Sequence, residues 1–95
     1  MADIKIERED GPNGGRYVTV INGDEAEMTY SRAGKTRIII DHTGVPDSMR
    51  GMGVGKKLVE AAVNDARTEG FKIIPLCPFA KATLEKHAEW HDVVQ

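Results

Sequence analysis

Two apolar segments separated by one helix-like segment constrain the fold of this chain more than any other feature. The first, residues 36–42, contains three consecutive isoleucines, and the second, residues 71–77, again carries neighbouring isoleucines. Between them, apolar side chains recur at helical spacing from near Met52 to near Glu69, and Gly70 follows as a C-terminal cap. A strand, a helix and a strand in this order join the two strands in parallel, with a right-handed crossover. The sequence therefore predicts an α/β chain that contains a parallel strand pair.

Three further strands are predicted upstream, where apolar and polar residues alternate. Residues 4–7 alternate isoleucine with charged side chains, and the glycine-rich residues 11–15 end this first strand. A second strand, residues 16–21, leads into a third through Asn22-Gly23, which is a strong signal for a two-residue hairpin. With residues 36–42 as the fourth strand, these runs predict an antiparallel four-strand meander ahead of the strand-helix-strand unit.

Single residues refine this prediction. In the third strand, the face expected in the core consists of Ala26, Met28 and Tyr30. The continuous isoleucines at 38–40 suggest that the fourth strand is central and covered on both faces. Pro75 predicts that the fifth strand lies at an edge or is interrupted. Pro78 suits the first position of a last helix, which is expected to continue to about Trp90.

Length and charge limit the possible functions. The 95 residues are enough for one small domain, so we expect a single domain over residues 1–95. The net charge is -2, with 13 basic and 15 acidic residues spread along the chain, so neither nucleic acid nor a membrane is an expected partner. The one cysteine and the alternating charges of residues 1–10, which lack the apolar segment of a secretory signal, predict a cytoplasmic location.

A glycine-rich stretch, MRGMGVGKK from Met49 to Lys57, lies between the fourth strand and the helix. It does not fit the phosphate-loop motif of nucleotide-binding proteins, which requires glycine where the chain has Arg50 and serine or threonine where it has Lys57. It does not fit the dinucleotide motif G-x-G-x-x-G either, since the third glycine would fall on Lys56 or Leu58. Neither of these two nucleotide-binding functions is therefore predicted.

The pattern that remains is R-x-x-G-x-G from Arg50 to Gly55, directly before a helix. Without side chains at the glycines, backbone N–H groups can converge on a phosphate at the positive end of the helix dipole. Lys56 and Lys57 can add positive charge from the first helical turn. The stretch is either a pyrophosphate site or a glycine-rich loop with a solvated basic edge.

Together with Val45-Pro46, residues 50–58 resemble the acetyl-coenzyme A signature of the general-control-related (GNAT) N-acetyltransferases. The chain is most similar to the short stand-alone YjdJ-like branch, which shares His42-Thr43 after the fourth strand and Cys77-Pro78-Phe79 after the fifth. The resemblance implies a truncated GNAT-like fold and an acetyl-coenzyme A-dependent N-acetyltransferase. The implied partners are a coenzyme A thioester and an amine acceptor, small molecule or protein, of unknown identity, and the expected state is a monomer or a weak homodimer.

The resemblance also implies where the cofactor lies. The pyrophosphate of coenzyme A would lie on the N–H groups of residues 51–57, and the pantetheine arm would run like an extra strand along residues 43–45, where strands four and five splay. The implied cofactor-binding residues are Thr43, Val45, Arg50, Gly51, Met52, Gly53, Val54, Gly55, Lys56 and Lys57. Full-length members have a helical segment after the first strand that walls the acceptor site. Here only residues 11–15 occupy that place, so the acceptor site is undefined.

Acetyl transfer to an amine needs a neutral nucleophile, a polarised thioester carbonyl and a group that protonates the departing thiolate. Many family members use a tyrosine after the fifth strand as this acid, but Tyr17 and Tyr30 both lie upstream. Cys77, directly before a helix start, is a candidate acid or a nucleophile that carries the acetyl group, and alternatively a small buried apolar residue. His42 is a candidate base for the incoming amine, or a histidine held by a local hydrogen bond.

Two further sets of residues leave alternatives open. His87 and His91 are four residues apart and would point the same way on a helix, but a zinc site needs more ligands, so no metal is expected. Trp90 and Phe79 are interpreted as core or rim residues of the last helix, and Phe79 could also flank the pantetheine channel. The alternative to an enzyme is a non-catalytic module that binds coenzyme A or another protein.

Overall fold

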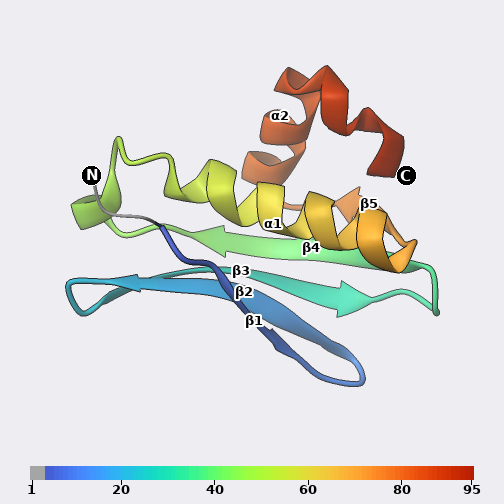
Figure 1. Ribbon diagram of the computed structural model, residues 1–95, viewed down its shortest axis with the longest axis horizontal. Helices are drawn as coiled ribbons and strands as arrows, with labels where there is room; N and C mark the ends of the chain where they lie inside the picture. The colour runs from blue at the N-terminus through green and yellow to red at the C-terminus, as the bar shows by residue number, and fades with distance from the viewer. Residues whose placement is uncertain (1–3) are drawn as a thin grey trace.

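A computed structural model describes residues 4–95 and shows in them one five-stranded sheet with both α-helices on the same side (Figure 1). The elements are β1 (Glu7–Asp10), β2 (Gly14–Ile21), β3 (Asp24–Arg32), β4 (Arg37–Gly44), the 3₁₀ turn η1 (Asp47–Met49), α1 (Val54–Glu69), β5 (Lys72–Pro75), α2 (Pro78–Lys86) and the 3₁₀ segment η2 (Ala88–Val93). The strands lie side by side in chain order. The first four are antiparallel and β5 is parallel to β4, which confirms the predicted meander and the predicted parallel strand pair.

The hairpin between β2 and β3 forms where the sequence predicted it. Asn22 and Gly23 have φ angles of 52° and 82°, and two residues with positive φ are what the tight hairpin turn requires. The first strand is shorter than predicted, because its pairing with β2 begins only at Glu7. Ile4 and Ile6 precede it and are partly buried against the core.

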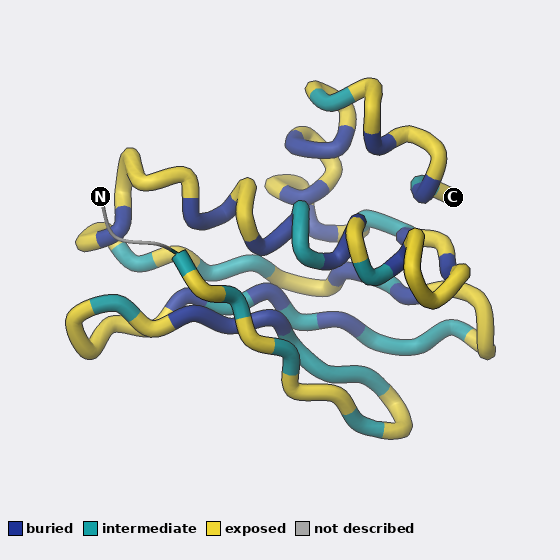
Figure 2. Tube along the Cα trace, viewed as in Figure 1, coloured by how far each residue is buried: buried dark blue, intermediate teal, exposed yellow. Residues whose placement is uncertain are grey.

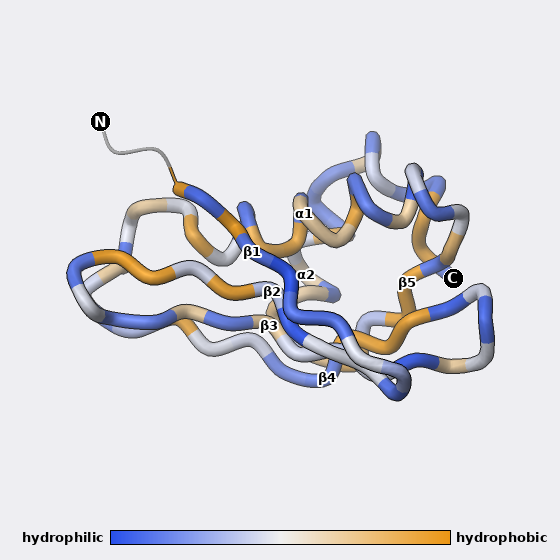
Figure 3. The backbone as a smooth tube through the Cα atoms, turned by 60° about the horizontal axis from the view of Figure 1, so that its bottom comes forward, coloured by the Kyte–Doolittle hydropathy of each residue, from blue (hydrophilic) through white to orange (hydrophobic). Residues whose placement is uncertain are grey.

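Helix α1 covers one face of the sheet, and the core lies between them (Figure 2). Ile38 and Ile40 of β4 are each 1% exposed and point toward this core, as do the predicted core residues of β3. The isoleucines of β4 and β5 lie beside one another as Ile38↔Ile73 and Ile39↔Ile74. Figure 3 shows hydrophobic stretches along the sheet strands. Ile39, however, is only partly buried on the opposite face. The prediction that β4 is covered on both faces was therefore wrong, since no described helix lies over the second face.

The ends of α1 follow from two glycines. The helix begins at Val54 rather than near Met52, because Gly53 takes a left-handed conformation with φ of 73° and so interrupts the helix before it. Gly70, with φ of 80°, ends the helix as predicted, and its N–H donates to the carbonyl of Ala66 at 2.8 Å.

The last helix is shorter than the sequence predicted. Helix α2 starts at Pro78 as expected, but it ends at Lys86, because His87 leaves helical geometry with φ of -116° and ψ of 87°. Trp90 therefore lies in η2, where it is buried and stacks on His87 with ring centroids 4.3 Å apart. His91 Nε2 lies instead 3.1 Å from the carbonyl oxygen of Leu84, so the two histidines do not share one helical face.

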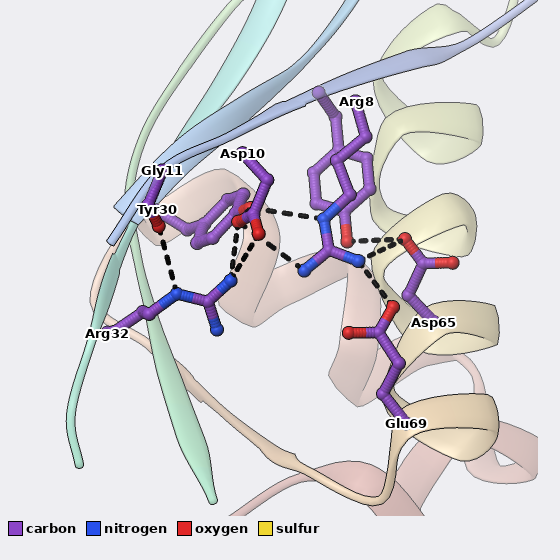
Figure 4. Close-up of polar contacts among 8 residues, drawn as sticks. Arg8, Asp10, Gly11, Tyr30, Arg32, Asp65 and Glu69 are labelled. Atoms are coloured by element: carbon purple, nitrogen blue, oxygen red, sulfur yellow. Dashed lines mark hydrogen bonds and ion pairs between the residues drawn. The ribbon is translucent and has the colours of Figure 1, made fainter. Parts of the chain in front are cut away.

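The strand β1 is held against α1 by one charged side chain (Figure 4). The guanidinium of Arg8 lies over the rings of Tyr17 and Tyr30, 5.7 Å and 5.6 Å from their centroids. It also pairs with Asp65, at 3.2 Å, and with Glu69 of α1. Burial, followed by a hydrogen bond to Asp65, raises the pKa of Tyr17, so its hydroxyl stays protonated and donates to that carboxylate at 2.8 Å. Arg8 thus connects the first strand to the end of the helix.

Two expectations concern where the protein is located. Within residues 4–95 no helix has the length and apolar character needed to span a bilayer. The prediction that residues 1–10 are not a secretory signal includes residues 1–3, which lie outside the described part of the chain.

Candidate functional site

Strands β4 and β5 separate near the middle of β4. Their pairing ends with Ile40 opposite Pro75, and the N–H groups of Leu76 and Cys77 then both donate to the carbonyl of Ile40, at 3.1 Å and 3.0 Å. The chain turns away into α2, while β4 continues to Gly44 alongside β3 alone. Among the described residues, this half of β4 therefore has no strand partner on its β5 side, and its edge can accept an extended ligand.

A β-bulge decides which side chains lie beside Cys77. Tyr30 pairs with Ile40, but Thr29 pairs with His42, so no residue of β3 lies opposite Asp41 in the strand register. Simple alternation from the buried Ile40 would place His42 on the helix-covered face. The extra residue reverses this order beyond the bulge.

The structure therefore brings Thr43, and not His42, next to Cys77. Thr43 pairs with the buried Met28, and its Oγ1 lies 3.4 Å from Cys77 Sγ. His42 pairs with Thr29 and is exposed on the open face of the sheet. The two residues predicted as catalytic thus lie on opposite faces at the end of β4.

Cys77 is buried, with 6% of its surface exposed, and it is the residue that precedes α2. Burial by itself raises the pKa of this thiol. The Thr43 hydroxyl and the N-terminal amides of α2 at Ala80 and Phe79 lower it by more, so the net shift of the Cys77 pKa is downward. The thiol donates to Thr43 Oγ1, and a thiolate would accept from the same hydroxyl after the hydroxyl rotates.

A hollow of about 370 Å³ opens between the start of α1 and one face of α2, and we call it the α1–α2 hollow. The residues that line it are Val45, Met49, Arg50, Gly51, Gly53, Val54, Gly55, Lys56, Phe79, Thr83, Lys86 and His87. Seven of the ten residues implied as cofactor-binding are among them. Thr43, Met52 and Lys57 are not, and Lys57 Nζ instead lies 3.5 Å from Glu60 Oε1.

The start of α1 is positively polarised and has no side-chain cap. The first N–H groups of a helix have no acceptor within the helix, and here the capping residue is Gly53, which offers no side chain. No acidic residue lies in the first turn. Arg50 and Lys56 add charge beside these amides, although Arg50 also pairs with Asp47 at 2.9 Å. Because that pair is exposed, it is weak and leaves the guanidinium available to another anion.

Gly53 and Gly55 each suit their positions for a different reason. Gly53 takes positive φ, which other residues rarely adopt. Gly55 is helical, but a Cβ there would lie 2.4 Å from Cζ of Phe79. The absence of a side chain at Gly55 therefore lets the Phe79 ring pack on the start of α1.

The α2 side of the hollow was missed by sequence reasoning, except for Phe79. Phe79, Thr83 and Lys86 are spaced four and three residues apart and so share one helical face. The sequence already contains that spacing. It does not show what this helical face lies against, because only the packing of α2 against α1 brings the face to the glycine-rich loop.

Comparison with known proteins decides the family. Residues 16–93 match the family model described as GCN5-related N-acetyl-transferase. The chain belongs to the GCN5-related N-acetyltransferase family. The matched N-acetyltransferase region runs from β2 into η2, so it includes the end of β4, Cys77 and the whole α1–α2 hollow.

Individual proteins are also similar to this chain. The solution structure of a GCN5-like protein from Staphylococcus aureus is 44% identical, with a TM-score of 0.71, over 94% of this chain and 87% of that one. Protein NATD1 of Xenopus tropicalis is 37% identical over 59 residues, and human protein NATD1 is 34% identical over 64. These alignments cover 60% and 65% of this chain but only 54% and 57% of the relatives. The predicted superfamily and fold class are confirmed, and the YjdJ-like branch stays a prediction.

Proposed function

We propose that this member of the N-acetyltransferase family binds acetyl-coenzyme A in the α1–α2 hollow and transfers the acetyl group to an amine. One observation carries the proposal: the uncapped start of α1 and the free edge of β4 adjoin the same hollow. Val45 lines that hollow, and Thr43, two residues earlier, contacts Cys77. A bound molecule with an anionic end and an extended arm could therefore reach from the helix start to the thiol.

The anionic end of the substrate fits the start of α1. The first-turn N–H groups of α1 have no side-chain cap, and Arg50 and Lys56 would supply charge for a pyrophosphate beside them. The amides of a pantetheine arm would pair with the backbone edge of residues 43–45 as an added strand does. Backbone groups contribute to both sets of contacts, and the side chains of Arg50 and Lys56 add charge at the anionic end.

The reactive end of the arm would reach Cys77. We propose that the Cys77 thiolate attacks the thioester carbonyl, that the bond from this carbonyl to the coenzyme A sulfur breaks, and that coenzyme A leaves as a thiol after taking up a proton. A neutral amine then attacks the S-acetyl group, the amide forms, and the Cys77 thiol is restored with the proton of the amine. The lowered pKa of Cys77 favours the first of these steps.

His42 is proposed as the base that removes the additional proton of a charged ammonium acceptor, and so delivers the neutral amine, when the acceptor approaches from the open face of the sheet. Its exposed position at the end of β4 suits that approach. The same observation favours a second candidate, a module that binds coenzyme A without transfer, because His42 and Cys77 lie on opposite faces.

Mass spectrometry and turnover test these roles. After incubation with acetyl-coenzyme A, the intact protein should gain one acetyl group at Cys77. Cys77→Ala should abolish thiol release with an amine panel while acetyl-coenzyme A still raises the melting temperature. Leu76→Ala, at the exposed neighbouring position, serves as the matched control and should retain turnover.

The other outcomes are equally informative. Turnover without an adduct, reduced about 10²–10⁴-fold in Cys77→Ala, would make Cys77 the acid for the departing thiolate. Binding without turnover on any amine would favour the coenzyme A-binding module. No rise in melting temperature with saturating acetyl-coenzyme A would refute both proposals.

A further inference from the structure

The α1–α2 hollow has basic groups on two separate walls. Arg50 and Lys56 come from the glycine-rich wall, and Lys86 and His87 come from the C-terminal end of α2. No aspartate or glutamate is among the described residues that line it. In a chain with a net charge of -2, the hollow is therefore a locally positive site.

Lys86 is the basic group on the α2 wall that is free to bind an anion. His87 Nδ1 lies 3.4 Å from Glu89 Oε2, so a carboxylate already stands beside it. Lys86 forms no ion pair with any carboxylate of residues 4–95. A second hollow lies on another face of α2, and its lining includes both Lys81 and Glu85. Of these two faces of α2, the one toward α1 is therefore the face whose hollow is lined by basic residues and by no carboxylate residue.

Two walls with basic groups fit a ligand with anionic groups at two positions. Coenzyme A has this chemistry, since it carries a pyrophosphate in its chain and a separate phosphate on the ribose 3′ oxygen. We infer that Lys86 binds the 3′-phosphate while the start of α1 binds the pyrophosphate, an assignment that rests on the proposed function. The pyrophosphate site then holds any pantetheine nucleotide, and Lys86 selects those that carry the additional phosphate.

The inference predicts different affinities for two ligands that differ by a single group. Dephospho-coenzyme A lacks the 3′-phosphate and retains the pyrophosphate and the pantetheine arm. Isothermal titration calorimetry should therefore show that the wild-type protein binds coenzyme A about three- to tenfold more tightly than dephospho-coenzyme A, as expected for one partly exposed charge-assisted contact.

Two variants locate the discrimination. Lys86→Ala should weaken coenzyme A binding until its affinity equals that for dephospho-coenzyme A, whose own affinity should not change. Lys81→Ala removes a lysine from the opposite side of the same helix and should leave both affinities unchanged. Unfolding of each variant in urea, which serves as a folding control, should show a single transition as in the wild type.

Each result has one interpretation. Equal wild-type affinities for the two ligands would overturn the role of Lys86 and leave the proposed function intact. The same holds if Lys86→Ala weakens both ligands alike, since Lys86 would then act on a group that they share. If the wild-type protein binds neither ligand, the proposed function falls, and this inference falls with it.

Discussion

Substitution of Gly55 by alanine tests the contact between the glycine-rich loop and α2. The new Cβ would stand 2.4 Å from Cζ and 2.7 Å from Cε2 of Phe79. Overpacking of this kind costs about 1–3 kcal/mol, and we expect about 1–1.5 kcal/mol because a partly exposed ring can swing outward. Phe79 is 43% exposed. Replacing a glycine in a helix also stabilises by up to about 1 kcal/mol, so the net loss in the wild-type background should be small.

A double-mutant cycle isolates the contact from the helix propensity. In the Phe79→Ala background there is no ring to displace, so Gly55→Ala should stabilise the protein by up to about 1 kcal/mol. The coupling between the two sites should then be about 1–1.5 kcal/mol, measured by urea unfolding of the four proteins. If Gly55→Ala has the same effect in both backgrounds, within about 0.3 kcal/mol, the ring does not pack on Gly55 and the reasoning fails.

Three further predictions follow from single contacts. Gly53→Ala should lower the free energy of unfolding in urea by about 1–2 kcal/mol through backbone strain at φ of 73°. The loss should be the same in the wild-type and Phe79→Ala backgrounds, and an unchanged midpoint would contradict the left-handed conformation. Thr43→Val should raise the pKa of Cys77 by removing the hydroxyl that lowers it, so the pH midpoint of iodoacetamide alkylation should rise; an unmoved midpoint would exclude that contact. Tyr30, followed by Arg32 and Arg8, lowers the pKa of Asp10, so the stability that its carboxylate contributes is complete above the unfolded value of 3.8 and is lost as pH falls below it. Asp10→Asn should therefore flatten the acid side of the stability profile, and an unaltered slope would show that Asp10 contributes nothing to it.

Most of the fold could be predicted because its signals are local. Asn22-Gly23 specifies its hairpin by the φ angles that it tolerates, and Gly70 and Pro78 mark helix ends through their own backbone chemistry. The end of α2 had no such signal. His87 leaves the helix although it is neither glycine nor proline, and the buried Trp90 shows that packing against the core accompanies the break.

The candidate site could be predicted only along one of its walls. Residues 50–56 stand together in sequence, so glycines and basic side chains directly before a helix were enough to indicate an anion site. Lys86 lies some thirty residues later, and its basic group joins the hollow only because α2 packs beside the start of α1.

What the sequence determined by itself was the order of the strands and helices, the hairpin and the bare, basic start of α1, since each depends on residues close together in the chain. Only the tertiary structure decided which side chains meet at the end of β4. One unpaired residue, Asp41, reverses the alternation that begins at Ile40, so Thr43 rather than His42 faces Cys77. Side chains alternate with a period of two along a strand, and a bulge changes that phase through pairing with a neighbouring strand. The sequence of β4 alone does not contain that pairing.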